Sequence, residues 1–198
     1  MTSDVRPRPA LTKSQEARRE RVTRAALELG SEGGYDAVQM RDVATRAEVA
    51  LGTIYRYFPS KDALLAAVMV QWVSDLERKV NRHPPQGATT AERVSDVLSR
   101  ALRSMGRDTG LTGAVVTAMT AGDPAGVEAM HQVTAVMARI LRPAFPEEVD
   151  PAVEAAAAKA LGHVWWSATI SWANGMGDMG WVADELRSAT DLICERFG

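Results

Sequence analysis

The stretch from Gly33 to Lys61 constrains the fold of this chain most, because it encodes two helices too short to be stable alone. The first is predicted from apolar residues that recur with the period of a helix, at Met40, Val43, Ala44 and Ala47. Residues 48–50 break that register, and a second helix is predicted over residues 51–57. A helix of this length is unstable in water by itself. Its stability must come from packing, and Ile54 and Phe58 form its expected buried side.

The opposite side of this second helix is polar, with Thr53, Arg56 and Tyr57 expected to face outward and Tyr55 at the flank. A short helix held on a scaffold with polar side chains outward is what a helix-turn-helix needs, because the DNA major groove admits one α-helix. No apolar periodicity explains Thr53, Arg56 or Lys61, so nucleic-acid contact is the favoured interpretation. Tyr57 can instead be half-buried packing, and that alternative stays open.

The pattern G-Y-x-x-V-x-x-R-x-V-A-x-x-A-x-V-A-x-G-T-I-Y-R-Y-F-P-S-K, which ends at Lys61, resembles the DNA-binding domain of the TetR (tetracycline-repressor-like) family. Within that family it is most similar to the KstR-type repressors of bacterial sterol catabolism. The resemblance covers the first third of the chain. It implies an N-terminal helix-turn-helix domain followed by a helical domain that binds an effector and forms a dimer.

The resemblance also assigns DNA contacts to particular residues. Thr53 and Arg56 would reach base edges, and a bidentate pair between Arg56 and guanine is worth about 1–3 kcal/mol. Leu51 and Gly52, at the tip of the helix, would lie close to the DNA, where glycine has no side chain to obstruct the approach. Phosphates would be held by Gln39, Arg41, Tyr55, Tyr57 and Lys61.

Three residues depart from the common pattern of the family. Gln39 replaces the usual Thr, Glu48 replaces Gly, and Ala50 replaces a Ser that often caps the second helix. Glu48 is expected in the left-handed conformation, at a cost of about 1 kcal/mol for a residue with a β-carbon. Ala50 removes a side-chain cap worth about 1 kcal/mol. These changes weaken local stability without removing a group that contacts DNA.

The rest of the chain is predicted to be helical, and no strand pattern occurs in it. A first helix over residues 14–31 should end at Gly33 and Gly34, and its four arginines (18, 19, 21 and 24) are expected to form a solvated face. Further helices are predicted from periodicity and from capping signals at Ser60, Thr89, Asp123 and Asp150. The predicted division is a disordered basic leader (1–13), the helix-turn-helix domain (14–60), and a helical effector-binding and dimerisation domain (61–198). The leader, with Arg6, Arg8 and Lys13, either follows the DNA backbone or enters a minor groove, or it has no fixed role.

The net charge of −2 conceals an asymmetry between the two parts of the chain. Residues 1–61 carry eleven Lys/Arg against eight Asp/Glu, a balance of +3, whereas the remainder carries twelve against seventeen, a balance of −5. A basic N-terminal part on an acidic body suits a protein that attracts phosphate at one end. The single cysteine, Cys194, excludes an internal disulfide and is expected to be a small buried residue. The sequence shows no signal peptide, and the uncharged run 160–177 contains too many polar residues for a membrane span, so a cytoplasmic location is expected.

The helix predicted from Asp150 to about Asn174 has apolar or small residues on nearly every side, so it should be buried all round. In a chain of this size that requires a partner surface on its second face. The family resemblance implies that the last two helices pair with those of a second copy, in a four-helix dimer interface.

Methionines and tryptophans indicate an adaptable cavity in the body. The candidate lining residues come from three consecutive helices and from the helix after them, and flexible thioethers suit a pocket for bulky apolar molecules. Each residue taken alone is more often an ordinary core residue, and that alternative stays open. The candidates are Met105, Met119, Met130, Met137, Trp165 and Trp166.

The predicted function is a ligand-responsive transcriptional repressor that binds a palindromic operator as a homodimer and is released by a bulky apolar effector. By the KstR resemblance, a sterol-derived acyl-coenzyme A thioester is the candidate effector. An enzyme is disfavoured, because the sequence has no catalytic set at recognisable spacing, no phosphate-binding glycine loop and no metal-ligand cluster, and no cofactor is expected. The alternative is a helical small-molecule carrier without operator function, which would leave the polar surface at Thr53 and Arg56 unexplained.

Overall fold

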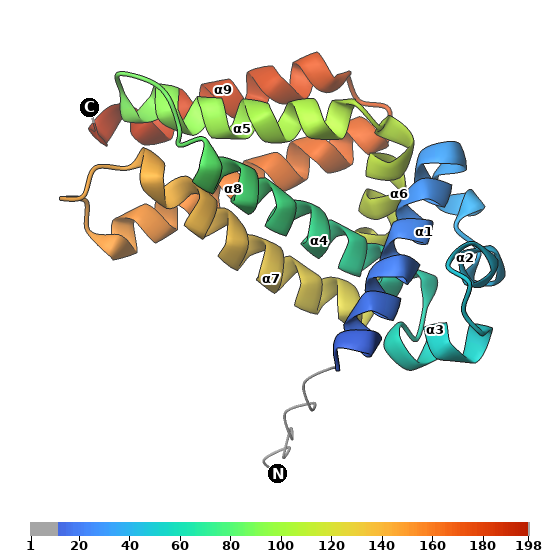
Figure 1. Cartoon of the computed structure of the whole chain (residues 1–198). Helices are drawn as coiled ribbons and strands as arrows, with labels where there is room; N and C mark the ends of the chain where they lie inside the picture. Colours follow the sequence, from blue (N-terminus) through green and yellow to red (C-terminus); the bar gives the residue numbers. More distant parts are fainter. Residues whose placement is uncertain (1–11, 198) are drawn as a thin grey trace, which may run out of the picture.

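The computed structural model describes residues 12–197, and within them every regular element is helical (Figure 1). The predicted all-α fold class is therefore confirmed. Arg6, Arg8 and the leader up to residue 11 lie outside the described residues, and Lys13 already belongs to the first helix. The helices are α1 (Lys13–Ala37), α2 (Met40–Arg46), α3 (Leu51–Tyr57), α4 (Lys61–Arg82), α5 (Thr90–Gly106), α6 (Thr109–Thr120), α7 (Pro124–Leu141), α8 (Pro151–Ala173) and α9 (Met179–Cys194), with short 3-10 turns at Arg142–Ala144 and Glu195–Phe197.

The helices are arranged as a small N-terminal group attached to a larger body. Helices α1, α2 and α3 lie at one end of the molecule (Figure 1). Helix α4 leaves this group and runs beside α7, while α8 and α9 pair with each other and α5 packs on α9. Helix α6 packs on both α1 and α4, so it connects the N-terminal group with the body.

The helix starts agree with the capping signals in the sequence. The Ser60 hydroxyl accepts a hydrogen bond from the amide of Ala63 at 2.9 Å and caps α4. Thr89 and Glu92 form the reciprocal capping box at the start of α5. Asp123 and Asp150 cap α7 and α8, and each is followed by proline in the first turn.

The structure corrects the predicted end of the first helix. Helix α1 does not end at the two glycines, because the helical path resumes after them and continues to Ala37. Gly33 and Gly34 instead make a kink, where Gly34 has a φ of 68° and a ψ of −156° that a residue with a β-carbon rarely adopts. At the other end of the chain, α9 ends at Cys194, and the chain then tightens into a 3-10 turn that reaches Phe197.

Two hydrophobic cores organise the fold. The body core is formed by the later part of α4 together with α5, α7, α8 and α9. The N-terminal core contains the inner faces of α1, α2 and α3, but α4 also contributes Leu64, Leu65 and Val68 to it. From α6 it receives Ala114 and Ala118. The predicted boundary after residue 60 therefore falls within a continuous packed cluster, in which α1, α2 and α3 are buried against α4 and α6.

Hydrogen bonds and one close approach tie the N-terminal group to the body. The Ser31 hydroxyl donates to the carboxylate of Asp108, just before α6. The Ser60 hydroxyl donates to Asp123 Oδ2 at 2.6 Å and so joins the start of α4 to the start of α7. A β-carbon on Gly30 would lie 2.8 Å from Leu111 Cδ1, so glycine permits α1 to approach α6 this closely.

The double role of Asp123 can be measured. Its Oδ1 accepts from the amide of Ala125 at 2.7 Å, as a helix cap, and its Oδ2 accepts from Ser60. Removal of such a cap costs about 0.5–2 kcal/mol, and the lost Ser60 bond should add about 0.5–1.5 kcal/mol. We expect Asp123→Ala to lower the free energy of unfolding in urea by more than its matched control, Asp150→Ala. Asp150 caps α8 in the same way without a partner on α4, so equal losses in the two variants would show that the Ser60 bond contributes nothing.

Candidate nucleic-acid interface and internal cavity

Helix α3 is held in place by the burial of its inner side. Ile54 is fully buried and Phe58 is only 3% exposed, and both belong to the N-terminal core. No side-chain cap is present at Ala50, as its sequence predicted. Glu48 has a φ of 54°, which confirms the predicted left-handed conformation in the turn between α2 and α3. Burial of two apolar side chains thus compensates for a short helix with a weak start.

The outer side of α3 is open to solvent. Tyr55 and Arg56 are exposed, and Thr53 and Leu51 are half-buried at the edge of the same surface. A β-carbon built on Gly52 would meet no atom within 4 Å. Packing within this chain therefore does not require glycine at the tip of α3. A partner that approaches the backbone from outside would give a reason for it, as the resemblance to DNA-binding domains implies.

Gln39 and Arg41 lie at the start of α2 and are both exposed. The Gln39 side-chain amide donates to the carbonyl of Asp36 at 2.8 Å, so it orders the connection between α1 and α2. Arg41 keeps its guanidinium on the surface. The assignment of both residues to phosphate contact stays a prediction.

Lys61 and Tyr57 have structural contacts beside their predicted DNA contacts. Lys61 Nζ donates to the carbonyl of Tyr35 at 3.1 Å and lies 3.6 Å from the centre of the Tyr35 ring. The Tyr35 hydroxyl in turn donates to Asp62 Oδ1 at 2.6 Å. This bond favours the neutral phenol and, together with burial, raises the pKa of Tyr35 to about 12. Tyr57 is half-buried against the N-terminal core, with the Arg56 guanidinium 5.2 Å from the centre of its ring.

Arg19 and Arg21 of α1 are exposed, in agreement with the predicted solvated face, and each also contacts the helix-turn-helix. Arg21 Nε donates to the carbonyl of Ala47 at 3.3 Å, at the C-terminal end of α2. A cation at this end of a helix is favourable for the helix dipole. The guanidinium of Arg19 lies 5.5 Å from the centre of the Phe58 ring, within the range of a cation–π contact. Periodicity gives no signal for either contact, because both partners come from other helices.

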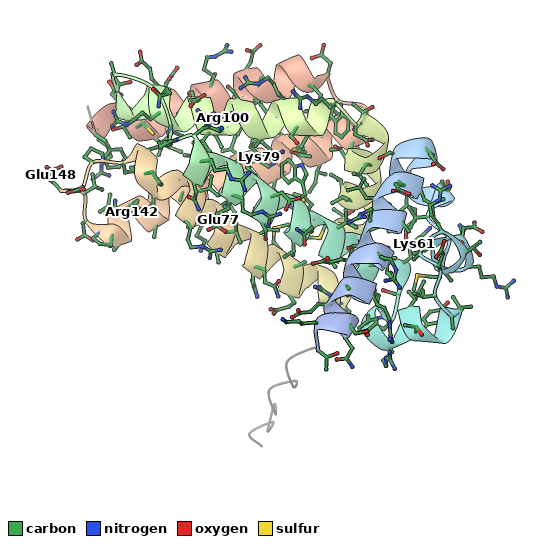
Figure 2. The ribbon with its side chains drawn as sticks, viewed as in Figure 1. Lys61, Glu77, Lys79, Arg100, Arg142 and Glu148 are labelled. Atoms are coloured by element: carbon green, nitrogen blue, oxygen red, sulfur yellow. The ribbon has the colours of Figure 1, made fainter. Side chains whose placement is uncertain are left out.

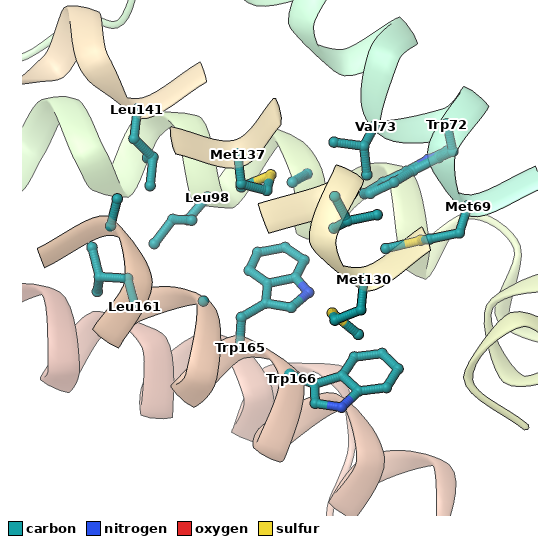
Figure 3. Close-up of a pocket in the computed structure, with 14 residues that line it drawn as sticks. Met69, Trp72, Val73, Leu98, Met130, Met137, Leu141, Leu161, Trp165 and Trp166 are labelled. Atoms are coloured by element: carbon teal, nitrogen blue, oxygen red, sulfur yellow. The ribbon is translucent and has the colours of Figure 1, made fainter. Parts of the chain in front are cut away.

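The body contains two adjacent cavities, the first between α4, α5, α7 and α8 and the second between α4, α5, α6 and α8. The first has a volume of about 50 Å³ and is lined by Met130, Met137, Trp165 and Trp166 among others (Figure 3). The second has a volume of about 130 Å³ and is lined by residues that include Met105 and the same two tryptophans. Five of the six predicted lining residues therefore meet around neighbouring spaces.

Met119 is the sixth predicted lining residue, and it lines neither cavity. It packs against the N-terminal core, because its side of α6 faces α1 and α4. Sequence reasoning instead missed Met69 and Trp72 of α4, which line both cavities. Their signal was the apolar stripe of α4, but a stripe does not distinguish a residue that faces a cavity from one that fills a core.

The lining of the first cavity is almost entirely apolar, whereas Ser104, Asp108, Thr112 and Thr169 also line the second. None of the residues around the first cavity is charged, and the second has Asp108 as its one charged residue. Both volumes are below the roughly 300–1,000 Å³ of pockets that hold drug-sized ligands. A large occupant would therefore have to displace side chains, and the four methionines around these spaces are the residue type best suited to do so.

Within residues 12–197, no helix combines the length and the apolar character that crossing a membrane requires. The same residues contain no group of three or more His, Cys, Asp or Glu side chains placed to hold a metal ion.

Cys194 is buried, as expected, and burial raises the pKa of its thiol to about 11.

A short exposed helix held by two others, joined to a helical body with an internal cavity, defines a helix-turn-helix DNA-binding protein with a second domain. The chain belongs to the TetR family of bacterial regulatory proteins. The family model "Bacterial regulatory proteins, tetR family" matches residues 22–68, and the model "Tetracyclin repressor-like, C-terminal domain" matches residues 87–193. The protein is thus a transcriptional regulator and not an enzyme.

Named relatives support the same assignment. The HTH-type transcriptional repressor KstR of Rhodococcus jostii (strain RHA1) is 36% identical over 180 residues, which are 91% of this chain and 84% of that protein. KstR of Mycobacterium tuberculosis (strain ATCC 25618 / H37Rv) is 32% identical over 182 residues, 92% of this chain and 83% of that protein. These similarities confirm the predicted likeness to KstR-type repressors.

Solved structures share the fold. A TetR transcriptional regulator from Rhodococcus sp. RHA1 matches with a TM-score of 0.79 at 29% identity, over 94% of this chain and 100% of that chain. Thermus thermophilus FadR, a TetR-family repressor in complex with lauroyl-CoA, matches with a TM-score of 0.69 at 23% identity, over 88% of this chain and 92% of that chain.

Proposed function

We propose that this protein is a repressor that binds a palindromic operator as a homodimer and is released by a bulky apolar effector, with a sterol-derived acyl-coenzyme A thioester as the candidate. The observation that carries the proposal is α3, whose inner side is buried and whose Thr53 and Arg56 lie on the outer surface. Such a regulator acts in the cytoplasm, on chromosomal DNA. The two DNA-binding domains of a dimer engage half-sites separated by one turn of DNA or a multiple of it.

The cavity and α4 supply the link between effector and DNA. Met69 and Trp72 of α4 line the cavities, and the first turn of α4 is bonded to α1 through Lys61 and Asp62. An occupant that displaces these cavity residues shifts α4 and, with it, the spacing of the two DNA-binding domains. The effect can be no larger than the preference of the effector for one of the two shapes. The lauroyl-CoA complex of a neighbour with the same fold supports a thioester as effector class.

The homodimer is proposed to use α8 and α9. The inner side of α8 is buried, but its outer side exposes small residues, among them Ala155, Ala156 and Gly162. Leu192 of α9 is 76% exposed, although a leucine normally gains about 1.5–3 kcal/mol from burial. Small side chains permit close approach of a second helix pair, and an exposed leucine gives it apolar area to cover.

Binding to DNA is tested by gel shift with the DNA upstream of the coding sequence, repeated at several salt concentrations. A regulator should show a steep salt dependence together with a sequence-specific component. A helical carrier without operator function should show no sequence-specific component.

In the same assay, Arg56→Ala should weaken operator binding by about 1–3 kcal/mol and relax specificity at one base pair.

The control for this variant is Arg82→Ala. Arg82 is also exposed and lies on α4 at the end away from the helix-turn-helix. The operator affinity of Arg82→Ala should equal that of the wild-type protein. Equal affinities of Arg56→Ala and wild type across operator variants would contradict the assigned role of Arg56.

The effector is tested by thermal denaturation and operator release with the coenzyme A thioester of 3β-hydroxy-5-cholenoic acid, a steroid acid. Because the cavity is apolar, the steroid thioester should raise the melting temperature and release operator DNA. Acetyl-CoA, which has the same head and no bulky apolar part, should raise the melting temperature far less and should leave the operator bound. No shift with any steroid thioester would remove the sterol proposal, and tighter operator binding would reverse the proposed direction of control.

The dimer surface is tested by Leu192→Arg, measured by sedimentation velocity. A buried, unpaired arginine is costly, so this variant should shift the protein toward monomer and weaken operator binding with it. Val127→Arg is the matched control, because Val127 of α7 is 57% exposed and lies outside α8 and α9. The proposed interface is wrong if the two variants sediment alike.

A further inference from the structure

A basic groove, distinct from the two internal cavities, lies on the surface of the body between α4 and α5. It has a volume of about 380 Å³ and is lined by Lys79, His83, Arg100, Arg103 and Arg107, together with Trp72, Leu76 and Ser104. Figure 2 shows Lys79 on α4 and Arg100 on the neighbouring α5. No acidic residue lines the groove.

The positive charge of this groove is only partly neutralised. Arg100 forms an ion pair with Asp96 and donates to the carbonyl of His83. Lys79, Arg103 and Arg107 form no ion pair with any residue in 12–197. The groove holds four of the twelve Lys/Arg that follow residue 61, in a part of the chain whose balance is −5. Concentration of cations in one concave surface of an otherwise acidic body favours a bound anion.

The groove adjoins the apolar cavities through one side-chain pair. Trp72 lines the groove and both cavities, and Ser104 lines the groove and the larger cavity. The Trp72 indole donates from Nε1 to Ser104 Oγ at 3.1 Å, so this pair forms the wall between the basic space and the apolar one. A single molecule that passes this wall would place a charged part in the groove and an apolar part in the cavity.

We propose that the groove between α4 and α5 binds the phosphorylated head of an amphiphilic effector, of the type found in a coenzyme A thioester, whose apolar part occupies the internal cavity. This inference rests on the proposed function, and it specifies which residues recognise the effector. Arg103 and Arg107 contact phosphate oxygens, since guanidinium groups match phosphate geometry with paired hydrogen bonds. The apolar cavity alone offers no cation for such a head.

The proposal accounts for the choice between a thioester and the corresponding free acid. Both carry the same apolar part, but only the thioester carries phosphates for the groove. The wild-type protein should therefore bind the thioester of 3β-hydroxy-5-cholenoic acid at least tenfold more tightly than the free acid. Arg103→Glu and Arg107→Glu should each reduce thioester affinity at least tenfold in calorimetric titration and leave the affinity for the free acid unchanged.

The control variant is Arg78→Glu, which makes the same charge change on α4 but outside this groove. It should bind the thioester as the wild type does. Arg103 and Arg107 are both exposed, so their substitution should leave the melting temperature near that of the wild type. Arg103→Gln, which removes the charge without reversing it, should show a smaller loss in the same direction.

A second titration tests the groove independently of the steroid. Adenosine 3′,5′-bisphosphate, the phosphorylated nucleoside of coenzyme A, should bind the wild type weakly and lose this binding in Arg103→Glu and Arg107→Glu. If neither steroid ligand binds but the bisphosphate does, the sterol part of the proposed function fails and the groove assignment stands. If the free acid binds and releases operator while the thioester binds no more tightly in any variant, the proposed function stands and the groove assignment is overturned.

DNA phosphates are the rival occupant of a basic groove, and operator binding without effector separates the two. Arg103→Glu should bind operator with the affinity and salt dependence of the wild type. A loss of operator affinity together with a shallower salt dependence would make the groove a DNA-contacting surface and would overturn the proposal.

Discussion

Burial of Ile54 and Phe58 is the constraint on which the rest of the protein depends. Helix α3 has seven residues and no side-chain cap, so it cannot fold by itself. The apolar side of α3 enters a core built by α1 and α2, and the same contact turns Thr53 and Arg56 outward. Stability and the exposed polar surface therefore arise from one packing arrangement.

The N-terminal core extends beyond the DNA-binding domain, and this has a mechanical consequence. Leu64 and Leu65 of α4 and Ala118 of α6 belong to it, so two body helices are packed directly against α1. The hydrogen bonds from Ser31 to Asp108 and from Ser60 to Asp123 cross the same junction. Movement of α4 or α6 cannot leave the helix-turn-helix undisturbed, because close-packed side chains transmit strain.

The two cavities inside the body border α4, so a movement of this helix can begin there. Trp72 stands between two apolar cavities and a basic groove, and it belongs to the helix that carries the DNA-binding domain. The cavities are small and methionine-rich, so a large apolar occupant has to move their lining. An effector with a charged head and an apolar body would contact α4 both in the cavities and in the groove. It would therefore shift this helix more than an apolar molecule alone.

Local features of this protein could be predicted from the sequence, because their causes lie within one or two helical turns. The caps at Ser60, Thr89 and Asp123, and the left-handed Glu48, are of this kind. Contacts between distant segments could not be predicted, because they depend on how the helices pack in three dimensions. The bond from Arg21 to Ala47, the place of Met119 in the N-terminal core, and the basic groove between α4 and α5 were decided only by the tertiary structure. Periodicity shows which side of a helix is buried, but it does not show which neighbour that side meets or where a space remains between them.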